Sequence, residues 1–252
     1  MQEMNVLEQL VYYMQQNSAY VFSQFLRHFL ISVYGVLFAT VIGIPLGIYI
    51  ERHRKLSQWV ISLTNIIQTV PSMAMMSIIM IVMGLGVNTV ITTIFFYSLL
   101  PIVKNTYTGM ANLSPDLRDI AKGMGMSSFQ RLLKVELSLS MSVIMAGIRN
   151  ALIVAIGITS IGTFIGAGGL GDIITRGIDA TDGSAIIIAG ALPTALMAII
   201  MDIILEAIQG RFSHQIKGWK NVGYYLTFDN DEGMIRKILK RLDLESKPKM
   251  NW

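Results

Sequence analysis

The feature that most constrains this chain is the absence of any charged side chain between Trp59 and Val103. One bilayer crossing needs about 20 helical residues, so this stretch is about twice as long as a single crossing requires. It must therefore turn back on itself, and we expect the turn at Gly84-Leu85-Gly86-Val87-Asn88. Only 14% of the 252 residues are charged, against about 25% in soluble domains, which indicates an integral membrane protein.

The apolar pattern predicts an all-α, polytopic membrane protein with about five spans. The first runs from Phe29 to Ile50, two lie within residues 59–103, and the others cover Leu139 to Ile165 and about Ser184 to Gln209. We expect residues 1–24 to form an external, partly interfacial segment, residues 25–212 the membrane domain, and residues 213–252 a basic cytoplasmic tail. The stretch Gly43-Ile44-Pro45-Leu46-Gly47 in the first span predicts a kink or a close helix contact.

Lysine and arginine fix the expected orientation. If the loop at 51–58 is cytoplasmic, nearly all of the 20 Lys and Arg residues lie on the cytoplasmic side, and only Arg27 and Arg176 lie outside. The N-terminus is then outside and the C-terminus inside the cytoplasmic membrane. The tail is expected to be a positive-inside anchor, with sensing of ionic strength through anionic lipid as the alternative.

A polar island, residues 114–138, separates the third and fourth spans. Ser114 followed by Pro115 predicts a helix start, Gly125 predicts its end, and Ser127 with Gln130 predicts a capping box that opens a second short helix. An amphipathic helix pair beside a membrane offers its apolar face to lipid headgroups or to a soluble partner. A surface-lying loop is the alternative.

The island also carries a family resemblance. Asp119-Ile120-Ala121, Gly125 and Val135-Glu136-Leu137-Ser138 resemble the EAA motif of binding-protein-dependent, type I permeases of ATP-binding cassette (ABC) importers. The sequence departs from that motif with Asp for Glu, Ile for Ala, Val for Ile, and Ser138 for Pro, which permits an unbroken helix into the next span. The resemblance implies a coupling helix that docks on a cytoplasmic ATPase through Leu117, Asp119, Ile120, Ala121, Met124, Gly125, Phe129 and Leu137.

Two further stretches resemble the osmoprotectant branch of these permeases, namely Ile67-Gln68-Thr69-Val70-Pro71-Ser72 and the residues from Gly157-Ile158 to Gly166-Ala167-Gly168-Gly169-Leu170-Gly171. The implied cargo is glycine betaine, carnitine, choline or a similar quaternary ammonium osmolyte. Methionine permeases are similar in parts, so an amino-acid importer stays the alternative. The implied partners are an ATPase dimer, an external substrate-binding protein, and a second permease that is identical or a paralogue.

The chain is not expected to be an enzyme. It lacks a G-x-x-x-x-G-K-[ST] phosphate loop, so ATP and Mg²⁺ belong to the ATPase partner. It has no cysteine and three isolated histidines, so we expect no metal and no cofactor, and nothing indicates nucleic acid. An ion-coupled secondary transporter is less favoured because the unequal spans show no inverted repeat. A membrane enzyme would have only the Asp202 and Glu206 carboxylate pair for its chemistry.

Intramembrane polar residues and glycines are candidates for the transport path. A polar cluster surrounds the helix breaker Pro71, where interhelical hydrogen bonding is the alternative, and a glycine run after the fourth span favours close packing or a re-entrant outer gate. These candidates are Asn65, Gln68, Thr69, Pro71, Ser72, Gly166, Gly168 and Gly169. Arg149 lies deep in the fourth span, and we expect it to pair with Asp202, in a structural or a transport role.

Overall fold

The computed structural model describes the backbone of residues 5–227 and the side chains of residues 5–212. One compact unit ends at Phe212, and the helical residues 213–227 belong to a second unit. Beyond residue 227, the predicted basic tail lies outside the described residues.

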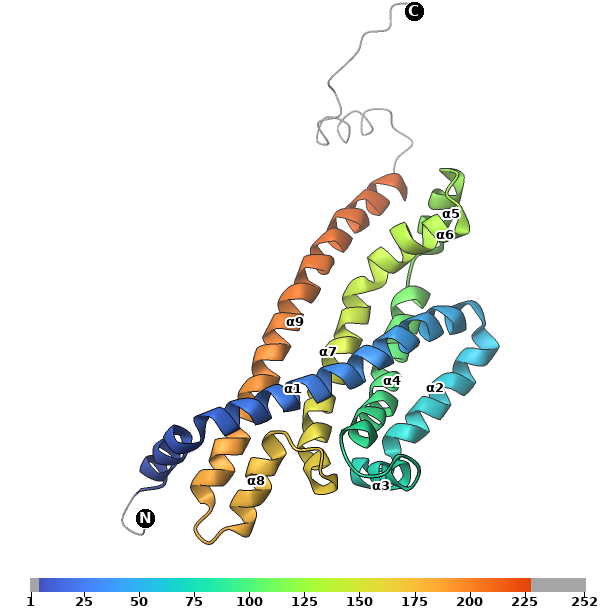
Figure 1. Ribbon diagram of the computed structural model, residues 1–252. Helices are drawn as coiled ribbons and strands as arrows, with labels where there is room; N and C mark the ends of the chain where they lie inside the picture. Colours follow the sequence, from blue (N-terminus) through green and yellow to red (C-terminus); the bar gives the residue numbers. More distant parts are fainter. Residues whose placement is uncertain (1–4, 228–252) are drawn as a thin grey trace, which may run out of the picture. The chain divides into compact units, whose positions relative to one another are not determined.

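The described residues are almost entirely helical (Figure 1). In chain order the helices are α1 (Val6–Arg52), α2 (Arg54–Thr69), α3 (Ser72–Met83), α4 (Val87–Ala111), α5 (Pro115–Gly123), α6 (Ser128–Arg131), a π-helical turn (Leu132–Glu136), α7 (Leu137–Ile161), a 3₁₀ turn (Gly162–Ile165), α8 (Leu170–Asp179) and α9 (Ser184–Thr227).

Four segments of the described chain are each long and apolar enough to cross a bilayer. They lie in α1, in α4, in the continuous run Ser128–Ile165, and in Ser184–Phe212 of α9. The pair α2 and α3 passes the same test only when taken together, and it is bent by 99° at a short break. The break is at Val70 and Pro71, where the sequence places a helix breaker.

The direction of α4 decides whether this bent pair crosses the membrane. Along α1, Gly35, Gly43 and Gly47 lie in turn against Ile94, Ile102 and Thr106 of α4, so the two helices run in the same direction. The chain must therefore return across the bilayer between residues 52 and 87. With 16 residues, α2 rises about 24 Å, and it covers most of that return. The bent pair is thus the second span in chain order and brings the total to five, which confirms the predicted all-α fold with five spans.

The predicted turn between the second and third spans is also confirmed. Helix α3 ends at Met83 and α4 begins at Val87. Gly84 and Gly86 between them have φ values of 77° and 110°, a region that favours glycine.

Helix α1 is continuous across residues 24 and 25, where the sequence places a boundary. Its interruption lies further back, at Asn17 (φ −118°, ψ 19°). The residues after this kink pack on the membrane domain, since Val21 is 5% exposed and His28 is fully buried. The sequence prediction for residues 1–24 used local polarity and aromatic residues. The structure shows that the residues after Asn17 continue α1, because they pack against distant parts of the chain.

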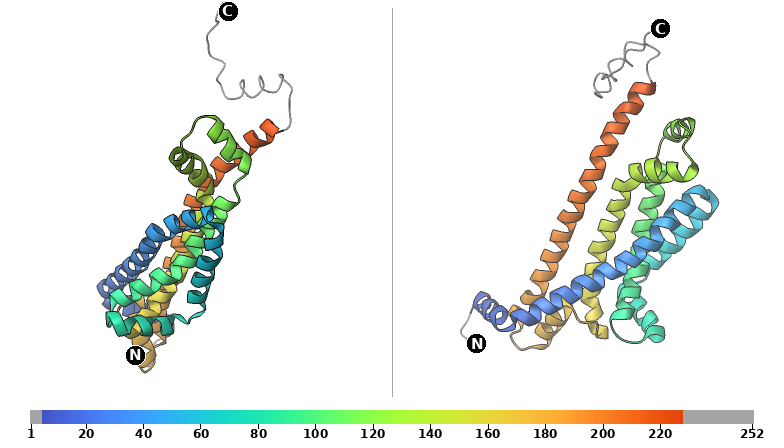
Figure 2. Two further views of the ribbon diagram at one scale, coloured as in Figure 1. Left: turned by 90° about the vertical axis from the view of Figure 1, so that its right-hand side faces the viewer. Right: turned by 45° about the horizontal axis from the view of Figure 1, so that its top comes forward.

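Helix α4 lies at the centre of the bundle, between α1 and α7 (Figures 1 and 2). Of its most apolar stretch 61% is buried, against 33% for α1 and 22% for the described part of α9. The outer faces of α1 and α9 are therefore left for lipid or for another subunit.

The close contact between α1 and α4 depends on small residues. A Cβ atom at Gly47 would lie 2.6 Å from Thr106 Cβ and 3.0 Å from the Val103 carbonyl oxygen. We expect Gly47→Leu to force the helices apart and to cost about 1–3 kcal/mol of stability, measured as a lower thermal unfolding temperature of the detergent-purified protein. Gly157→Leu in α7 is the matched control, because nothing lies within 4 Å of a Cβ there. Equal losses in both variants would contradict this packing role.

Candidate functional site

The polar island forms two short helices at one end of the bundle, beyond the ends of α4 and α7 (Figures 1 and 2). Helix α5 begins as predicted, with Ser114 before it and Pro115 at its first position, but the Ser114 hydroxyl caps no backbone N–H. It lies instead 3.4 Å from Asp116 Oδ2. The helix ends at Gly123, and the left-handed Gly125 (φ 77°) follows two residues later. The N–H groups of Gly125 and Met126 donate to the carbonyls of Lys122 and Ala121, respectively. These two bonds are the Schellman arrangement that glycine permits.

The predicted capping box of the second helix is confirmed. The Gln130 N–H donates to Ser127 Oγ at 3.3 Å, and the Ser127 N–H donates to Gln130 Oε1 at 3.0 Å. The chain then passes through the π-helical turn directly into α7. Ser138 lies inside α7, so the span continues without the break that a proline would impose.

Exposure separates the predicted coupling residues into two groups. Asp119, Ile120, Met124, Gly125 and Phe129 are exposed, whereas Leu117 and Leu137 are half-buried. Ala121 is only 1% exposed, so it packs inside the protein and cannot contact a partner. Leu133, which is 46% exposed, is a further large apolar side chain of the island that the predicted coupling residues did not include. We call the large exposed apolar residues of the island the coupling set, and its members are Ile120 (41%), Met124 (59%), Phe129 (69%) and Leu133.

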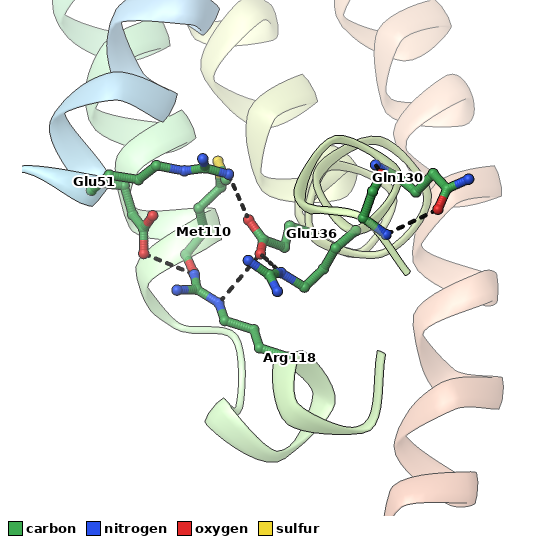
Figure 3. Close-up of polar contacts among 8 residues, drawn as sticks. Glu51, Met110, Arg118, Gln130 and Glu136 are labelled. Atoms are coloured by element: carbon green, nitrogen blue, oxygen red, sulfur yellow. Dashed lines mark hydrogen bonds and ion pairs between the residues drawn. The ribbon is translucent and has the colours of Figure 1, made fainter. Parts of the chain in front are cut away.

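A buried carboxylate ties the island to the rest of the protein (Figure 3). The side chain of Glu136 is 3% exposed and faces three arginines from different elements. Its oxygens lie 3.1 Å from Arg131 Nε, 3.7 Å from an Arg52 terminal nitrogen, and 3.9 Å from Arg118 Nε. We call these four side chains the Glu136 cluster.

Arg118 makes a second contact with α1 and extends this cluster to one further helix, α4. Its terminal nitrogen donates to Glu51 Oε1 at 2.8 Å and to the Met110 carbonyl oxygen at 2.9 Å (Figure 3). Helix α5 is thereby attached to the ends of α1 and α4. These contacts place the loop after α1 and the island on the same side of the membrane, in agreement with the charge distribution. The sequence offered no signal for a pairing 67 positions apart.

Around Pro71, two side chains of the polar cluster form hydrogen bonds, one to α4 and one within α2. Tyr97 of α4 donates its hydroxyl to the Val70 carbonyl, and Gln68 Nε2 donates to the Tyr97 carbonyl at 2.9 Å. Thr69 bonds to its own helix, at the Ile66 carbonyl. The remaining candidates, Asn65, Pro71 and Ser72, are exposed or half-buried. For Gln68 the interhelical alternative therefore has direct support, and a role of the cluster in the transport path stays a prediction.

The glycine run after α7 is held against α1. Arg27 Nε donates to the Ala167 carbonyl at 2.7 Å, and the Gly169 N–H donates to Gln24 Oε1 at 2.7 Å. Gly166, Gly168 and Gly169 all have positive φ values. A Cβ at Gly168 would lie 3.0 Å from Arg27 Nε, so this turn needs glycine for both its conformation and its contacts. An outer-gate role stays a prediction.

Two contacts of His28 also hold α1 against α7 and the end of the glycine run, and the sequence analysis did not single out this histidine. The Leu170 N–H donates to His28 Nδ1 at 3.2 Å, and His28 Nε2 lies 3.0 Å from the Ile156 carbonyl oxygen. Since Nδ1 accepts, Nε2 carries the proton and donates to Ile156. A neutral histidine thus joins α1, α7 and the start of α8.

Helix α8 makes a second contact with α1 through an ionic group. Asp172 accepts from the Tyr20 hydroxyl and from Arg176 Nε at 2.8 Å, and the Arg176 guanidinium lies 4.9 Å from the centre of the Tyr20 ring. The hydrogen bond to Asp172 raises the pKa of Arg176, so its charge is retained at every physiological pH.

The structure brings Arg149 and Asp202 together, between α7 and α9. Arg149 donates to both carboxylate oxygens of Asp202, from Nε and, at 2.7 Å, from a terminal nitrogen. That terminal nitrogen also lies 3.1 Å from Glu206 Oε2. The arrangement pairs the intramembrane cation with two carboxylates one turn apart. Nowhere among the described residues is a group of three or more His, Asp or Glu side chains placed to hold a metal ion.

Removing the buried carboxylate should loosen the island. Glu136→Ala leaves three arginines facing one another, and we expect a loss of about 2 kcal/mol, seen as a lower thermal unfolding temperature. Asp119→Ala, an exposed carboxylate of the same island, is the control and should change stability by less than about 0.5 kcal/mol. A Glu136→Ala variant as stable as the control would show that the cluster does not hold the island.

A charge exchange tests the intramembrane pair. Arg149→Asp and Asp202→Arg should each lower the yield of folded protein, because like charges then face each other between α7 and α9. The double variant Arg149→Asp/Asp202→Arg should recover most of the yield and of the thermal stability. No recovery in the double variant would mean that the two side chains do not stabilise the fold as a pair.

Comparison with known proteins agrees with this architecture. Residues 43–214 match the family described as the binding-protein-dependent transport system inner membrane component. The chain is 61% identical over 210 residues to the glycine betaine/carnitine/choline transport system permease protein OpuCD of Bacillus subtilis (strain 168), which covers 83% of this chain and 92% of that protein. It is 35% identical to OpuCB, the second permease protein named for that system, over 86% of this chain and 100% of that protein.

A solved structure shares the fold. An inward-facing conformation of the MetNI methionine ABC transporter superposes with a TM-score of 0.67 at 19% identity, over 76% of this chain and 95% of that chain. The family match covers α1 only from residue 43 onward, the other four spans in full, and the whole polar island. The chain belongs to the inner membrane components of binding-protein-dependent ABC importers, as a multi-pass permease of the cytoplasmic membrane whose ATP is hydrolysed by a separate subunit.

Proposed function

We propose that this permease imports a quaternary ammonium osmoprotectant, such as glycine betaine, carnitine or choline. The observation that carries the cargo class is the 61% identity to a permease named for these three solutes. The likeness to the methionine transporter, at 19% identity, concerns the fold alone. Import of an amino acid is the alternative that the experiment below separates.

The proposed complex contains two different permeases. One transport system of Bacillus subtilis supplies two relatives, OpuCD at 61% and OpuCB at 35% identity, which supports a paralogue as the second subunit here. An external binding protein delivers the solute, and a pair of ATPase subunits holds ATP and Mg²⁺. The weakly buried outer faces of α1 and α9 offer room for the second permease.

The coupling set is proposed as the surface that docks on the ATPase. Ile120, Met124 and Phe129 expose apolar area to the aqueous side, where the only available compensation is a partner. The orientation inferred from the charges makes this side cytoplasmic. Asp119 and Gly125 are exposed beside these side chains, which fits the same role.

The Glu136 cluster is proposed to pass the motion of the ATPase to the spans. A carboxylate held by Arg52, Arg118 and Arg131 makes α5, the end of α1 and the start of α7 move as one body. A rigid joint of this kind converts displacement of the coupling helices into displacement of the pathway helices, which is how alternating access is switched from outside the membrane.

Buried Ala121 changes the design of a docking test. A charged residue at this position would disrupt the packing of α5, and any residue with a Cβ at Gly125 would strain its left-handed backbone. Variants at the exposed Met124 and Phe129 test docking without either effect.

The test uses the complete importer reconstituted with its binding protein. We expect ATP-dependent uptake of labelled glycine betaine, carnitine or choline, and no comparable uptake of methionine. Met124→Glu/Phe129→Glu should release the ATPase and reduce uptake at least about tenfold, since two apolar contacts become charged. Leu7→Glu is the control. Leu7 lies near the start of α1, outside the coupling set, and is at least as exposed (73%) as Met124 and Phe129, so this variant should leave ATPase binding and uptake unchanged.

Each part of the proposal has its own contrary outcome. Methionine uptake without osmolyte uptake would overturn the cargo class while leaving the docking surface intact. A Met124→Glu/Phe129→Glu complex that assembles and transports normally would overturn the docking surface. Uptake by this permease alone, driven by an ion gradient, would overturn the ATP-driven mechanism.

A further inference from the structure

One cavity of the described residues is not explained by docking or by transport. It is an open pocket of about 930 Å³ between the loop after α1, the start of α2, helix α5 and the Glu136 cluster. Three of its lining residues are labelled in Figure 3, where Arg118 reaches Glu51 and Glu136. The lining is mainly cationic and includes Arg52, Arg54, Lys55, Arg118, Lys122 and Arg131.

The cations of this pocket fall into two groups. Arg52, Arg118 and Arg131 form the ion pairs to Glu51 and Glu136. The other three, Arg54, Lys55 and Lys122, are exposed and form no ion pair within the described residues. Asp119 is the remaining carboxylate of the lining. The pocket therefore keeps an excess of positive charge that faces the solvent, and an anion is the ligand that this excess attracts.

An apolar stripe of α2 begins at the pocket, because Leu56 lines it. Along α2, four exposed apolar side chains follow at intervals of three, four and three residues, which places them on one face of the helix. They are Leu56 (39%), Trp59 (78%), Leu63 (59%) and Ile66 (62%). Trp59 near the end of the stripe is typical of the boundary between headgroups and acyl chains. A ligand with a phosphate in the pocket and acyl chains along α2 would satisfy both surfaces.

We propose that this pocket binds the headgroup of an anionic phospholipid, with its phosphate between Arg54 and Lys55 of α2 and Lys122 of α5. The cytoplasmic leaflet supplies such lipids, and cations directly beside the end of a span attract them. The proposal shares only the inferred orientation with the proposed function, and it holds whichever solute is carried.

The apolar stripe favours a lipid over the other anions available. A soluble phosphate would use the cations and leave the α2 stripe without a role. An acidic surface of the ATPase would have to lie at bilayer depth to reach Trp59. A lipid uses both, and its phosphate bridges α2 to the coupling helix α5. The occupied site thereby adds a second link between the island and the spans, beside the Glu136 cluster.

The experiment measures lipid binding to the purified, delipidated importer complex by native mass spectrometry. The probes are phosphatidylglycerol, phosphatidylcholine and glycerol 3-phosphate. We expect phosphatidylglycerol to be retained in preference to the other two. Arg54→Gln/Lys55→Gln should raise the concentration needed for half-occupancy at least about tenfold, since each cation near an anionic surface contributes appreciably to binding. Lys122→Gln alone should raise it by a few-fold.

The matched control is Lys104→Gln/Lys134→Gln, which removes two exposed cations outside the pocket and should change half-occupancy by less than about twofold. Equal weakening in both double variants would overturn the proposal, as would equal retention of phosphatidylglycerol and phosphatidylcholine. Binding of glycerol 3-phosphate as tightly as the lipid would assign the pocket to a soluble phosphate. Loss of the ATPase from Arg54→Gln/Lys55→Gln with lipid binding unchanged would assign it to the ATPase interface.

Discussion

The attachment of the coupling helices depends on one buried carboxylate. The side chain of Glu136 is 3% exposed, and three arginines surround its carboxylate, so removing them would leave a buried carboxylate without partners. The arginines come from the end of α1, from α5 and from α6, so the charge balance exists only when these elements are assembled. The proposed transmission of motion from the coupling helices rests on this dependence, because elements that are held together by shared ion pairs are displaced together.

A second constraint fixes the topology of the spans. Because glycines of α1 pack in order against α4, these two helices are parallel, and the segment between them must cross the membrane despite its bend. A bend at Val70 and Pro71 leaves backbone groups without helical partners, which is costly in a bilayer. The Tyr97 hydroxyl of α4 donates to the Val70 carbonyl at the bend, and Gln68 beside the bend donates to the Tyr97 carbonyl, so α4 supports the broken span that it obliges the chain to form.

Much of this architecture could be predicted from local sequence signals. Apolar length predicts five spans, Lys and Arg predict their orientation, and Ser127 with Gln130 or Gly125 predict the ends of short helices, because each signal acts within a few residues. What could not be predicted depends on pairing between distant residues. The contact of Arg118 with Glu51 and the continuation of α1 past residue 24 belong to this class. Periodicity likewise placed Ala121 on the apolar face of α5 without showing that this part of the face is covered by the protein's own chain.

The same positive charge serves three physical roles at the cytoplasmic end of the bundle. In bulk, Lys and Arg orient the spans across the bilayer. Locally, Arg52, Arg118 and Arg131 neutralise the buried carboxylates that bind α5 to the spans. Arg54, Lys55 and Lys122 exceed what those carboxylates require, and the excess stands beside an apolar face of α2. Orientation alone would be satisfied by cations anywhere on this side. Their concentration around α5, next to the Glu136 cluster, is the feature on which the proposed lipid site rests.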